Sequence, residues 1–285
     1  MRGLAGACHP EPAVAVTIMA VALAAASGRT VWGTLAAGGA VLAGQLTVGW
    51  HNDWLDADRD ARAGRADKPI ARGDVARSAA EVAAFAAGLA TVPLSLLSGW
   101  QAGTAHIVAV ALALAYNAYL KATVVSFLPY LLAFPLLIAF ISLGRHPSQW
   151  PPWWALLGAA LLGTGAHLAN AAPDVADDAA TGVRGLPQRL GAIRSIGWAL
   201  ALMVASTGII GLGAGHLSRP GVGEITFLVL VLLLAMAGVL YAVLGRGSGG
   251  EQRWREVAGR RAWFRVAMLV AVANVALLVV KGTAL

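Results

Sequence analysis

Two segments of the chain repeat one spacing of oxygen-bearing side chains. The rows are Asn52, Asp56 and Asp60 in the first segment and Asn170, Asp174 and Asp178 in the second. Residues four apart lie on one face of an α-helix, so each row predicts an amide and two carboxylates side by side. Eight of the 14 acidic residues lie within 53–67 and 174–178. Carboxylates this dense repel each other, and a bound cation would relieve the repulsion.

Oxygen ligands of this kind suit Mg²⁺, which is usually held by one or two carboxylates together with substrate phosphates. We therefore predict that the two rows converge and hold two Mg²⁺ with one diphosphate between them. The basic residues that follow the rows are Arg62, Arg65, Lys68, Arg72, Arg184 and Arg189. Arginine and lysine bind phosphate oxygens, so this pattern favours a diphosphate site. Solvated acidic helix ends are the alternative, and the matched spacing argues against it.

The segments around these rows are apolar enough to cross a membrane. The chain is 58% hydrophobic and 12% charged, with a mean hydropathy of +0.70. Nine spans of about 20 apolar residues are predicted, the length that crosses the bilayer core. They lie near residues 11–28, 31–51, 77–98, 103–120, 123–143, 152–173, 194–215, 222–244 and 263–281.

The rows end the second and sixth of these spans, which predicts an internal duplication. We expect an all-α integral membrane protein with nine transmembrane helices around a central cavity. Its single domain covers 1–285, with two four-helix halves at 11–121 and 123–244 and an extra helix at 263–281.

Basic residues predict the orientation. The N-terminus and the loops after the even-numbered spans carry 16 Lys and Arg, whereas the opposite loops and the C-terminal tail carry four. This bias places the N-terminus and both rows in the cytoplasm. Because the basic residues lie in loops, the net charge of +7 does not indicate nucleic-acid binding. The abundance of Ala, Gly and Arg is typical of a GC-rich bacterial genome, so we expect a multi-pass protein of the bacterial plasma membrane.

At these residues the sequence resembles the UbiA superfamily of intramembrane prenyltransferases. Its signatures, Asn-Asp-x₂-Asp-x₃-Asp and Asp-x₃-Asp, are met by Asn52, Asp53, Asp56 and Asp60 and by Asp174 and Asp178. The resemblance implies that the Asn and Asp side chains hold two Mg²⁺ that bind an isoprenyl diphosphate. Asp56, Asp60, Asp174 and Asp178 would then be catalytic. Arg65 and Lys68 correspond in position to basic residues that contact the diphosphate.

The fourth span ends in a segment that resembles the family's Tyr/Lys element, whose lysine also faces the diphosphate. That lysine would be Lys121, which the resemblance makes a catalytic and diphosphate-binding residue. The spacing from Tyr116 to Lys121 is five, whereas several relatives use four. Tyr116, Asn117 or Tyr119 could therefore take the place of the tyrosine. The alternative for Lys121 is a helix-end lysine that extends to the membrane interface.

Three further residues are candidates for contacting the acceptor or orienting a ligand. His167 lies three residues before Asn170 and shares its face, so it could touch the acceptor or act as a base. A hydrogen bond between packed helices is the alternative for His167. Asp53 lies off the ligand face and could orient a ligand, pair with Arg62, or be solvated. Asp177 is also common in the family's second signature.

These features predict Mg²⁺-dependent transfer of an isoprenyl group from an isoprenyl diphosphate to an aromatic or lipid-like acceptor in the membrane. A related terpene cyclase, or a phosphoribosyl transferase acting on a lipid phosphate, would use the same metal site. A transporter would place its acids at mid-membrane in inverted halves, whereas these acids end spans of equal orientation. The CDP-alcohol phosphotransferases need an Asp-Gly-x₂-Ala-Arg core, which the sequence lacks.

Overall fold

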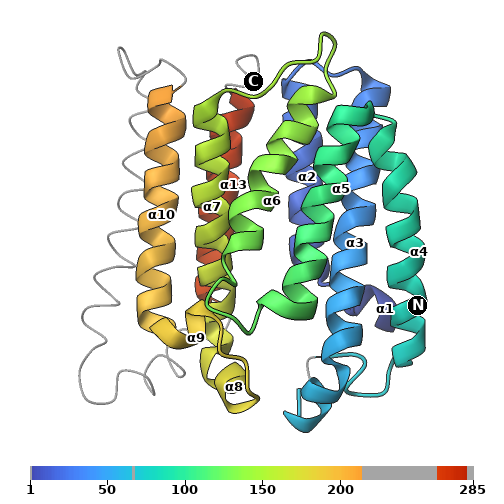
Figure 1. Cartoon of the computed structure of the whole chain (residues 1–285), viewed down its shortest axis with the longest axis vertical. Coiled ribbons are helices and arrows are strands. Elements are labelled where there is room, and N and C mark those ends of the chain that lie inside the picture. Colours follow the sequence, from blue (N-terminus) through green and yellow to red (C-terminus); the bar gives the residue numbers. More distant parts are fainter. Residues whose placement is uncertain (1, 66–67, 214–261, 281–285) are drawn as a thin grey trace.

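The computed structural model describes residues 2–65, 68–213 and 262–280, and all regular structure in these ranges is helical. The helices stand side by side in one bundle (Figure 1). The long ones are α2 (Pro10–Ala26), α3 (Val31–Arg62), α4 (Arg77–Leu96), α5 (Trp100–Ala115), α6 (Leu128–Leu143), α7 (Trp153–Ala171), α10 (Ala192–Gly213) and α13 (Ala262–Val280). Three short helices are α1 (Arg2–Gly6), α8 (Val175–Ala180) and α9 (Leu186–Leu190). The expected all-α fold is confirmed for this part of the chain.

Eight of the nine predicted spans correspond to these long helices. Five segments are long and apolar enough to cross a membrane by length and composition: Val31–Arg62, Arg77–Leu96, Trp100–Leu120, Trp153–Ala180 and Ala192–Gly211. Shorter apolar helices cover Pro10–Ala26, Leu128–Leu143 and Leu269–Val279. The predicted span at 222–244 lies outside the described residues, so nine spans and two equivalent halves stay predictions.

Neighbouring helices in the sequence are neighbours in the bundle. Helix α3 packs on α2 and α4, α6 packs on α5 and α7, and α10 packs on α7. Helix α13 contacts α2, α7 and α10, which brings the last described helix back to the first of the long ones (Figure 1). Small residues allow close contact between helices. Gly163 of α7, for example, lies so near α6 that a Cβ there would be 2.7 Å from the carbonyl oxygen of Tyr130.

Helix α3 continues to Arg62, eleven residues past the predicted end of its span at residue 51. The extension carries the whole first acidic row. It contains no Gly or Pro, and Arg59 and Arg62 in its last turn suit the negative end of the helix dipole. The helix ends before Gly64, whose φ of +64° is the left-handed conformation that commonly terminates helices.

Helix α6 begins at Leu128, later than the predicted start at residue 123. Pro129 occupies its first turn, where a missing backbone N–H costs nothing. The preceding residues form turns that join α5 to α6 at the same end of the bundle as the extension of α3.

Candidate active site

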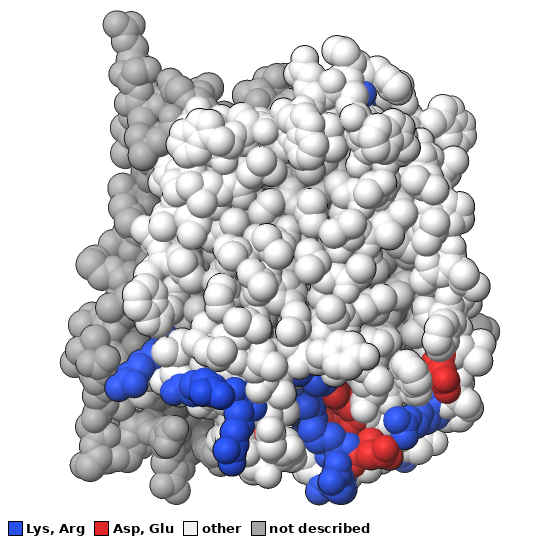
Figure 2. Space-filling view, in the orientation of Figure 1, with Lys and Arg blue, Asp and Glu red and all other residues white. Residues whose placement is uncertain are grey.

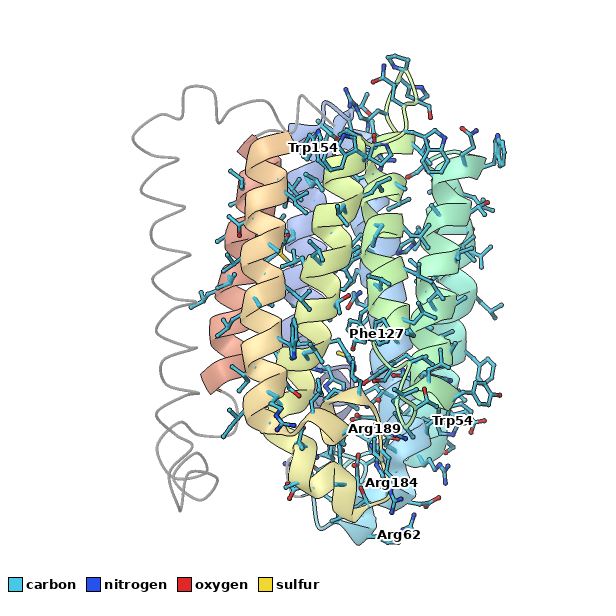
Figure 3. All side chains as sticks on the ribbon, turned by 60° about the vertical axis from the view of Figure 1, so that its left-hand side comes forward. Trp54, Arg62, Phe127, Trp154, Arg184 and Arg189 are labelled. Carbon is cyan, nitrogen blue, oxygen red and sulfur yellow. The ribbon has the colours of Figure 1, made fainter. Side chains whose placement is uncertain are left out.

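Charged side chains gather at one end of the bundle. In Figure 2 Lys, Arg, Asp and Glu cover the lower end, while the flank of the visible face is almost free of charge. Figure 3 places Arg62, Arg184 and Arg189 at this charged end and Trp154 at the opposite one. Both acidic rows lie at the charged end, because α3 ends there and α8 follows α7 there (Figure 1).

The first row lies on one face of α3, as predicted. Asp56 and Asp60 are buried, with 7% and 5% of their surface exposed, and Asn52 is half-buried. Asp56 accepts a hydrogen bond from Nζ of Lys121 and another, of 2.7 Å, from Nη2 of Arg59. Two cations therefore meet this one carboxylate, one from its own helix and one from the turn after α5.

The second row is less regular than the first, because it is not contained in one uninterrupted α-helix. Helix α7 ends at Ala171, a 3-10 turn covers Ala172–Asp174, and α8 begins at Val175. Pro173 lies in this turn and has no backbone N–H to continue the helical ladder. Asp174 and Asp178 are half-buried, and Asn170 is exposed.

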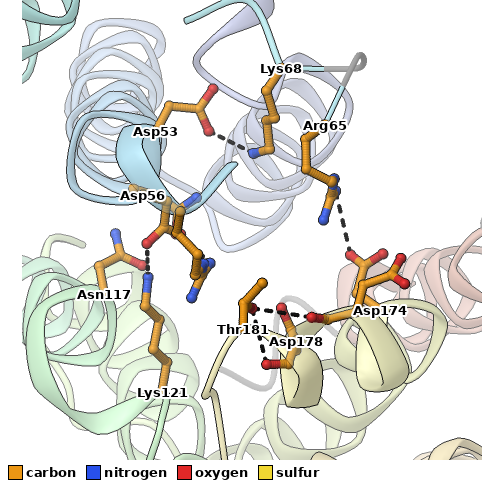
Figure 4. Close-up of polar contacts among 12 residues, drawn as sticks. Asp53, Asp56, Arg65, Lys68, Asn117, Lys121, Asp174, Asp178 and Thr181 are labelled. Atoms are coloured by element: carbon orange, nitrogen blue, oxygen red, sulfur yellow. Dashed lines mark hydrogen bonds and ion pairs between the residues drawn. The ribbon is translucent and has the colours of Figure 1, made fainter. Parts of the chain in front are cut away.

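The two rows nevertheless converge. Nη2 of Arg65, in the α3–α4 loop, lies 3.8 Å from a carboxylate oxygen of Asp174 and so joins the two segments. Figure 4 shows Asp56 and Lys121 on one side of the region between α3 and α8, with Asp174 and Asp178 on the other. Asp178 accepts a hydrogen bond of 2.9 Å from Nε2 of Gln188 in α9. Residues more than 100 positions apart thus share one polar site.

The side chains of this site fit Mg²⁺ by donor chemistry, since carboxylate oxygens are the ligands that the ion prefers. Within the ranges that the structure describes, however, no three His, Cys, Asp or Glu side chains are grouped closely enough to hold a metal ion. The carboxylates are instead partnered by cations and an amide: Asp56 by Lys121 and Arg59, Asp174 by Arg65, and Asp178 by Gln188.

Lys121 reaches Asp56 because the end of the fourth span is a π-helical turn. Residues Tyr116–Leu120 form this turn after α5, and the N–H of Lys121 donates to the carbonyl oxygen of Tyr116 five residues earlier, over 3.0 Å. A π-helical turn is wider than an α-helical turn and contains one residue more, so Tyr116 and Lys121 are five residues apart instead of four. Lys121 is 15% exposed, and burial lowers its pKa from the ordinary lysine value, a shift that the Asp56 carboxylate opposes.

The π-helical turn also decides which aromatic residue faces inward. Tyr116 contacts the rings of Tyr130 and His167, at centroid distances of 5.2 and 5.5 Å. Asn117 is buried and donates to the carbonyl oxygen of Val48, whereas Tyr119 is 78% exposed. Tyr116 and Asn117 therefore both face inward, Tyr116 is the aromatic one of the two, and Tyr119 is excluded.

The comparisons with known proteins agree with this geometry. The model of the UbiA prenyltransferase family matches residues 13–269. The chain belongs to the UbiA prenyltransferase family. Comparison with curated proteins gives no significant match.

Solved structures share the fold of this UbiA-family protein. A UbiA homologue from Aeropyrum pernix K1 is 16% identical, with a TM-score of 0.68 over 95% of this chain and 98% of that one. A UbiA homologue from Archaeoglobus fulgidus bound to GPP and Mg²⁺ is 14% identical, with a TM-score of 0.68 over 99% and 98%. A digeranylgeranylglyceryl phosphate synthase structure is 15% identical, with a TM-score of 0.65 over 100% and 99%. At these identities the likeness establishes the fold alone.

His167 makes a buried hydrogen bond to the turns that precede α6, rather than the predicted bond between packed helices. Its Nε2 lies 3.1 Å from the hydroxyl of Ser126, which also accepts the backbone N–H of Leu186 over 3.1 Å. The ring is tilted against that of Tyr130 at a centroid distance of 4.8 Å, and its Nδ1 is buried with no hydrogen-bond partner among the described residues. The Ser126 hydroxyl thus links α7 to the start of α9 in this UbiA-family protein.

The remaining predicted residues occupy different positions. Lys68 donates a 2.6 Å hydrogen bond to Asp53, so this lysine holds the α3–α4 loop against α3. Asp53 is 2% exposed, which excludes the solvated alternative, and Lys68 rather than Arg62 is its partner. Arg184 is exposed, and Asp177 is half-buried with its carbonyl oxygen accepting a hydrogen bond from Thr181.

Arg59 and Gln188 are polar residues of the site that were not predicted. Arg59 follows Asp56 by three residues, a helical spacing that could have identified it. Gln188 lies ten residues after Asp178 across a turn, and no spacing signals that contact. Its other amide atom, Oε1, is buried with no hydrogen-bond partner in the described structure.

Gly185 lies in close contact with the backbone of Lys121 and the side chain of Gln188, two residues of the site. A Cβ at this position would collide with the carbonyl oxygen of Lys121 and would lie 2.8 Å from Oε1 of Gln188. We expect Gly185→Ala to displace one or both residues, lowering stability by about 1–3 kcal/mol and activity by roughly tenfold. Thermal unfolding and initial rates in detergent would measure both. Gly197→Ala is the control, since a Cβ there meets nothing within 4 Å, and an equal loss in the control would contradict the packing argument.

Proposed function

We propose that this protein transfers an isoprenyl group from an isoprenyl diphosphate to an acceptor in the membrane, with Mg²⁺ as cofactor. The observation that carries the proposal is the meeting of two acidic segments, with cations between them, at one end of an apolar helical bundle. Related structures support the ligand class: homologues from Archaeoglobus fulgidus are bound to DMAPP and Mg²⁺ and to GPP and Mg²⁺. A digeranylgeranylglyceryl phosphate synthase of the same fold supports a lipid-like acceptor.

The metal-binding residues in this proposal are Asn52, Asp56, Asp60, Asp174 and Asp178. Asn170 is left out because its side chain is exposed. When bound, Mg²⁺ neutralises the oxygens of the diphosphate and helps it to leave. The orientation is also a proposal: the charged end, with the N-terminus, faces the cytoplasm.

The basic residues would stabilise the departing diphosphate. Lys121 and Arg59 already meet at Asp56, and Arg65 lies at Asp174, so three cations border the region between the rows. Negative charge grows on the diphosphate as the bond to the first prenyl carbon loosens, and fixed cations lower the energy of that state. Arg184, which is exposed, would act only at the outer edge of the site.

The aromatic residues would protect the allylic cation that remains. Tyr116, Tyr130 and His167 contact one another beside the π-helical turn that carries Lys121. Their rings exclude water, which would otherwise capture the cation before the acceptor attacks. His167 could contact the acceptor only if it gave up its hydrogen bond to Ser126. We therefore assign it the role of packing against the two tyrosines and not that of contacting the acceptor.

Product analysis tests the proposed function. Purified protein in detergent would be incubated with Mg²⁺ and geranylgeranyl diphosphate, with and without a panel of aromatic and lipid-phosphate acceptors. Mass spectrometry should detect an acceptor enlarged by one geranylgeranyl group, and only with acceptor present. A cyclised hydrocarbon or alcohol formed without acceptor would favour a terpene cyclase, and no product under either condition would contradict the proposal.

Replacing Lys121 tests the stabilisation of the leaving group. We expect Lys121→Met to lower kcat by about 10²-fold, the usual cost of removing one pre-positioned donor from such a site. Steady-state rates at saturating isoprenyl diphosphate would measure the change. Arg194→Met is the control, because it removes an exposed cation from α10. A loss below threefold at Lys121, or an equal loss at Arg194, would show that the lysine serves only as an interfacial residue.

A further inference from the structure

The segment that precedes the first long helix packs against α3 just before its extension. Trp50 donates a 2.8 Å hydrogen bond from its indole N–H to the carbonyl oxygen of Leu4 in α1. Gly49, the preceding residue, lies so close that a Cβ would collide with the backbone of Cys8. Cys8 is itself buried, at 6% exposure. Residues 4–8 are therefore fixed against α3 just before its acidic row begins.

The same segment also contacts the α3–α4 loop from its other side. A Cβ at Gly3 would lie 3.1 Å from the carbonyl oxygen of Asp74, and a Cβ at Gly6 would lie 3.1 Å from the ring of Pro69. Helix α1 thus occupies the angle between α3 and the loop that carries Arg65 and Lys68. Figure 1 shows α1 in the lower half of the bundle, near α3.

His9 connects this segment to the acidic row itself. Its Nε2 lies 3.0 Å from a carboxylate oxygen of Asp53, 3.0 Å from Nζ of Lys68 and 3.4 Å from the amide nitrogen of Asn52. The backbone of His9 has φ +53° and ψ +66°, a left-handed conformation that non-glycine residues adopt rarely. Such a conformation persists only where its surroundings stabilise it.

We infer that His9 is a positioning residue, which acts through Lys68 to hold the α3–α4 loop so that Arg65 meets the diphosphate. This inference rests on the proposed function. His9 lies before residue 13, where the match to the family model begins. The physical basis is the geometry at Lys68: Asp53 and His9 together fix its ammonium group from two elements, whereas Asp53 alone would fix it from one.

The loop transmits this restraint to the site. The backbone N–H of Lys68 donates to the carbonyl oxygen of Arg65, and the N–H of Arg65 donates to that of Asp60. A displacement of Lys68 therefore moves Arg65, whose guanidinium lies 3.8 Å from Asp174. A loosened Arg65 would weaken the capture of the diphosphate while leaving Lys121 and Asp56 in place.

His9→Gly tests the inference, because glycine adopts the left-handed backbone without strain and only the imidazole is lost. We expect KM for isoprenyl diphosphate to rise roughly three- to tenfold, with kcat within about twofold of wild type. Glu11→Gln, which alters a nearby exposed charge, is the matched control. His9→Asn, which tolerates the same backbone and keeps polar atoms, should recover part of the affinity.

A double-mutant cycle with Lys68→Met separates a role through Lys68 from a general effect on packing. If His9 acts through Lys68, the KM of the double variant should equal that of Lys68→Met alone. If the fold-increases in KM of the two single variants multiply in the double variant, the inference is overturned. An unchanged KM in His9→Gly would also overturn it.

Amide hydrogen exchange gives a readout that needs no substrate. Backbone amides of the α3–α4 loop should exchange faster in His9→Gly than in wild type, and those of α7 should not change. Unchanged exchange in the loop would also overturn the inference. If wild-type protein forms no prenylated product, the proposed function fails, and the exchange measurement still decides whether His9 holds the loop.

Discussion

Asp56→Asn should reduce prenyl transfer by at least about 10³-fold, because this carboxylate is both a predicted metal ligand and the point where two cations meet. The amide keeps the shape of the side chain but removes the negative charge that Lys121 and Arg59 contact. The variant would therefore lose a metal ligand and misplace two cations in one step. Initial rates with radiolabelled isoprenyl diphosphate would measure the loss.

Asp58→Asn is the matched control on the same helix, two residues further along. Asp58 is 75% exposed and pairs with Arg77 on the surface over 2.9 Å, so we expect rates within about twofold of wild type. Both variants should elute as folded protein on gel filtration in detergent, since the amide oxygen introduced by Asp56→Asn would still accept hydrogen bonds. Loss of activity in both variants, or retention in Asp56→Asn, would contradict the role assigned to the first row. Asp174→Asn should behave like Asp56→Asn, because it disables the second row.

Removal of Mg²⁺ should abolish activity without unfolding the protein. Chelation by EDTA is expected to lower the rate by at least about 10³-fold, because the diphosphate would leave without its main neutralising charge. The fold should survive, since two of the buried carboxylates already have protein partners: Asp56 contacts Lys121, and Asp53 contacts Lys68. Rates and thermal unfolding measured in the same EDTA-treated sample would separate the two effects.

Replenishment with different ions refines this expectation. Excess Mg²⁺ should restore the full rate, and Ca²⁺ should restore little, because Ca²⁺ is larger and prefers more ligands at longer distances. Because basic residues occupy the carboxylates, Mg²⁺ should bind more tightly in the presence of isoprenyl diphosphate than in its absence. Activity that persists in EDTA would count against a metal site, and a large fall in unfolding temperature would indicate a structural metal instead.

Much of the site could be predicted because helical spacing and charge density are local properties. The row Asn52, Asp56 and Asp60 is regular because α3 continues through it without Gly or Pro. Apolar length likewise predicted most helices, since a membrane leaves backbone groups no partners but their own helix. The prediction of element bounds was less accurate near prolines. Pro173 lies in the 3-10 turn that interrupts the second row, and Pro129 lies in the first turn of α6, which begins later than predicted.

The sequence by itself determined the helical bundle, the two acidic segments and the family, because periodicity, apolar length and fixed spacing depend only on neighbours along the chain. Only the tertiary structure decided which cation meets which carboxylate: Lys121 with Asp56, Lys68 with Asp53, and Arg65 with Asp174. It also decided that His9 reaches the first row. Such contacts join residues 15 to 109 positions apart. Which residues become partners depends on how the helices pack, and this cannot be predicted from the spacing of residues along the chain.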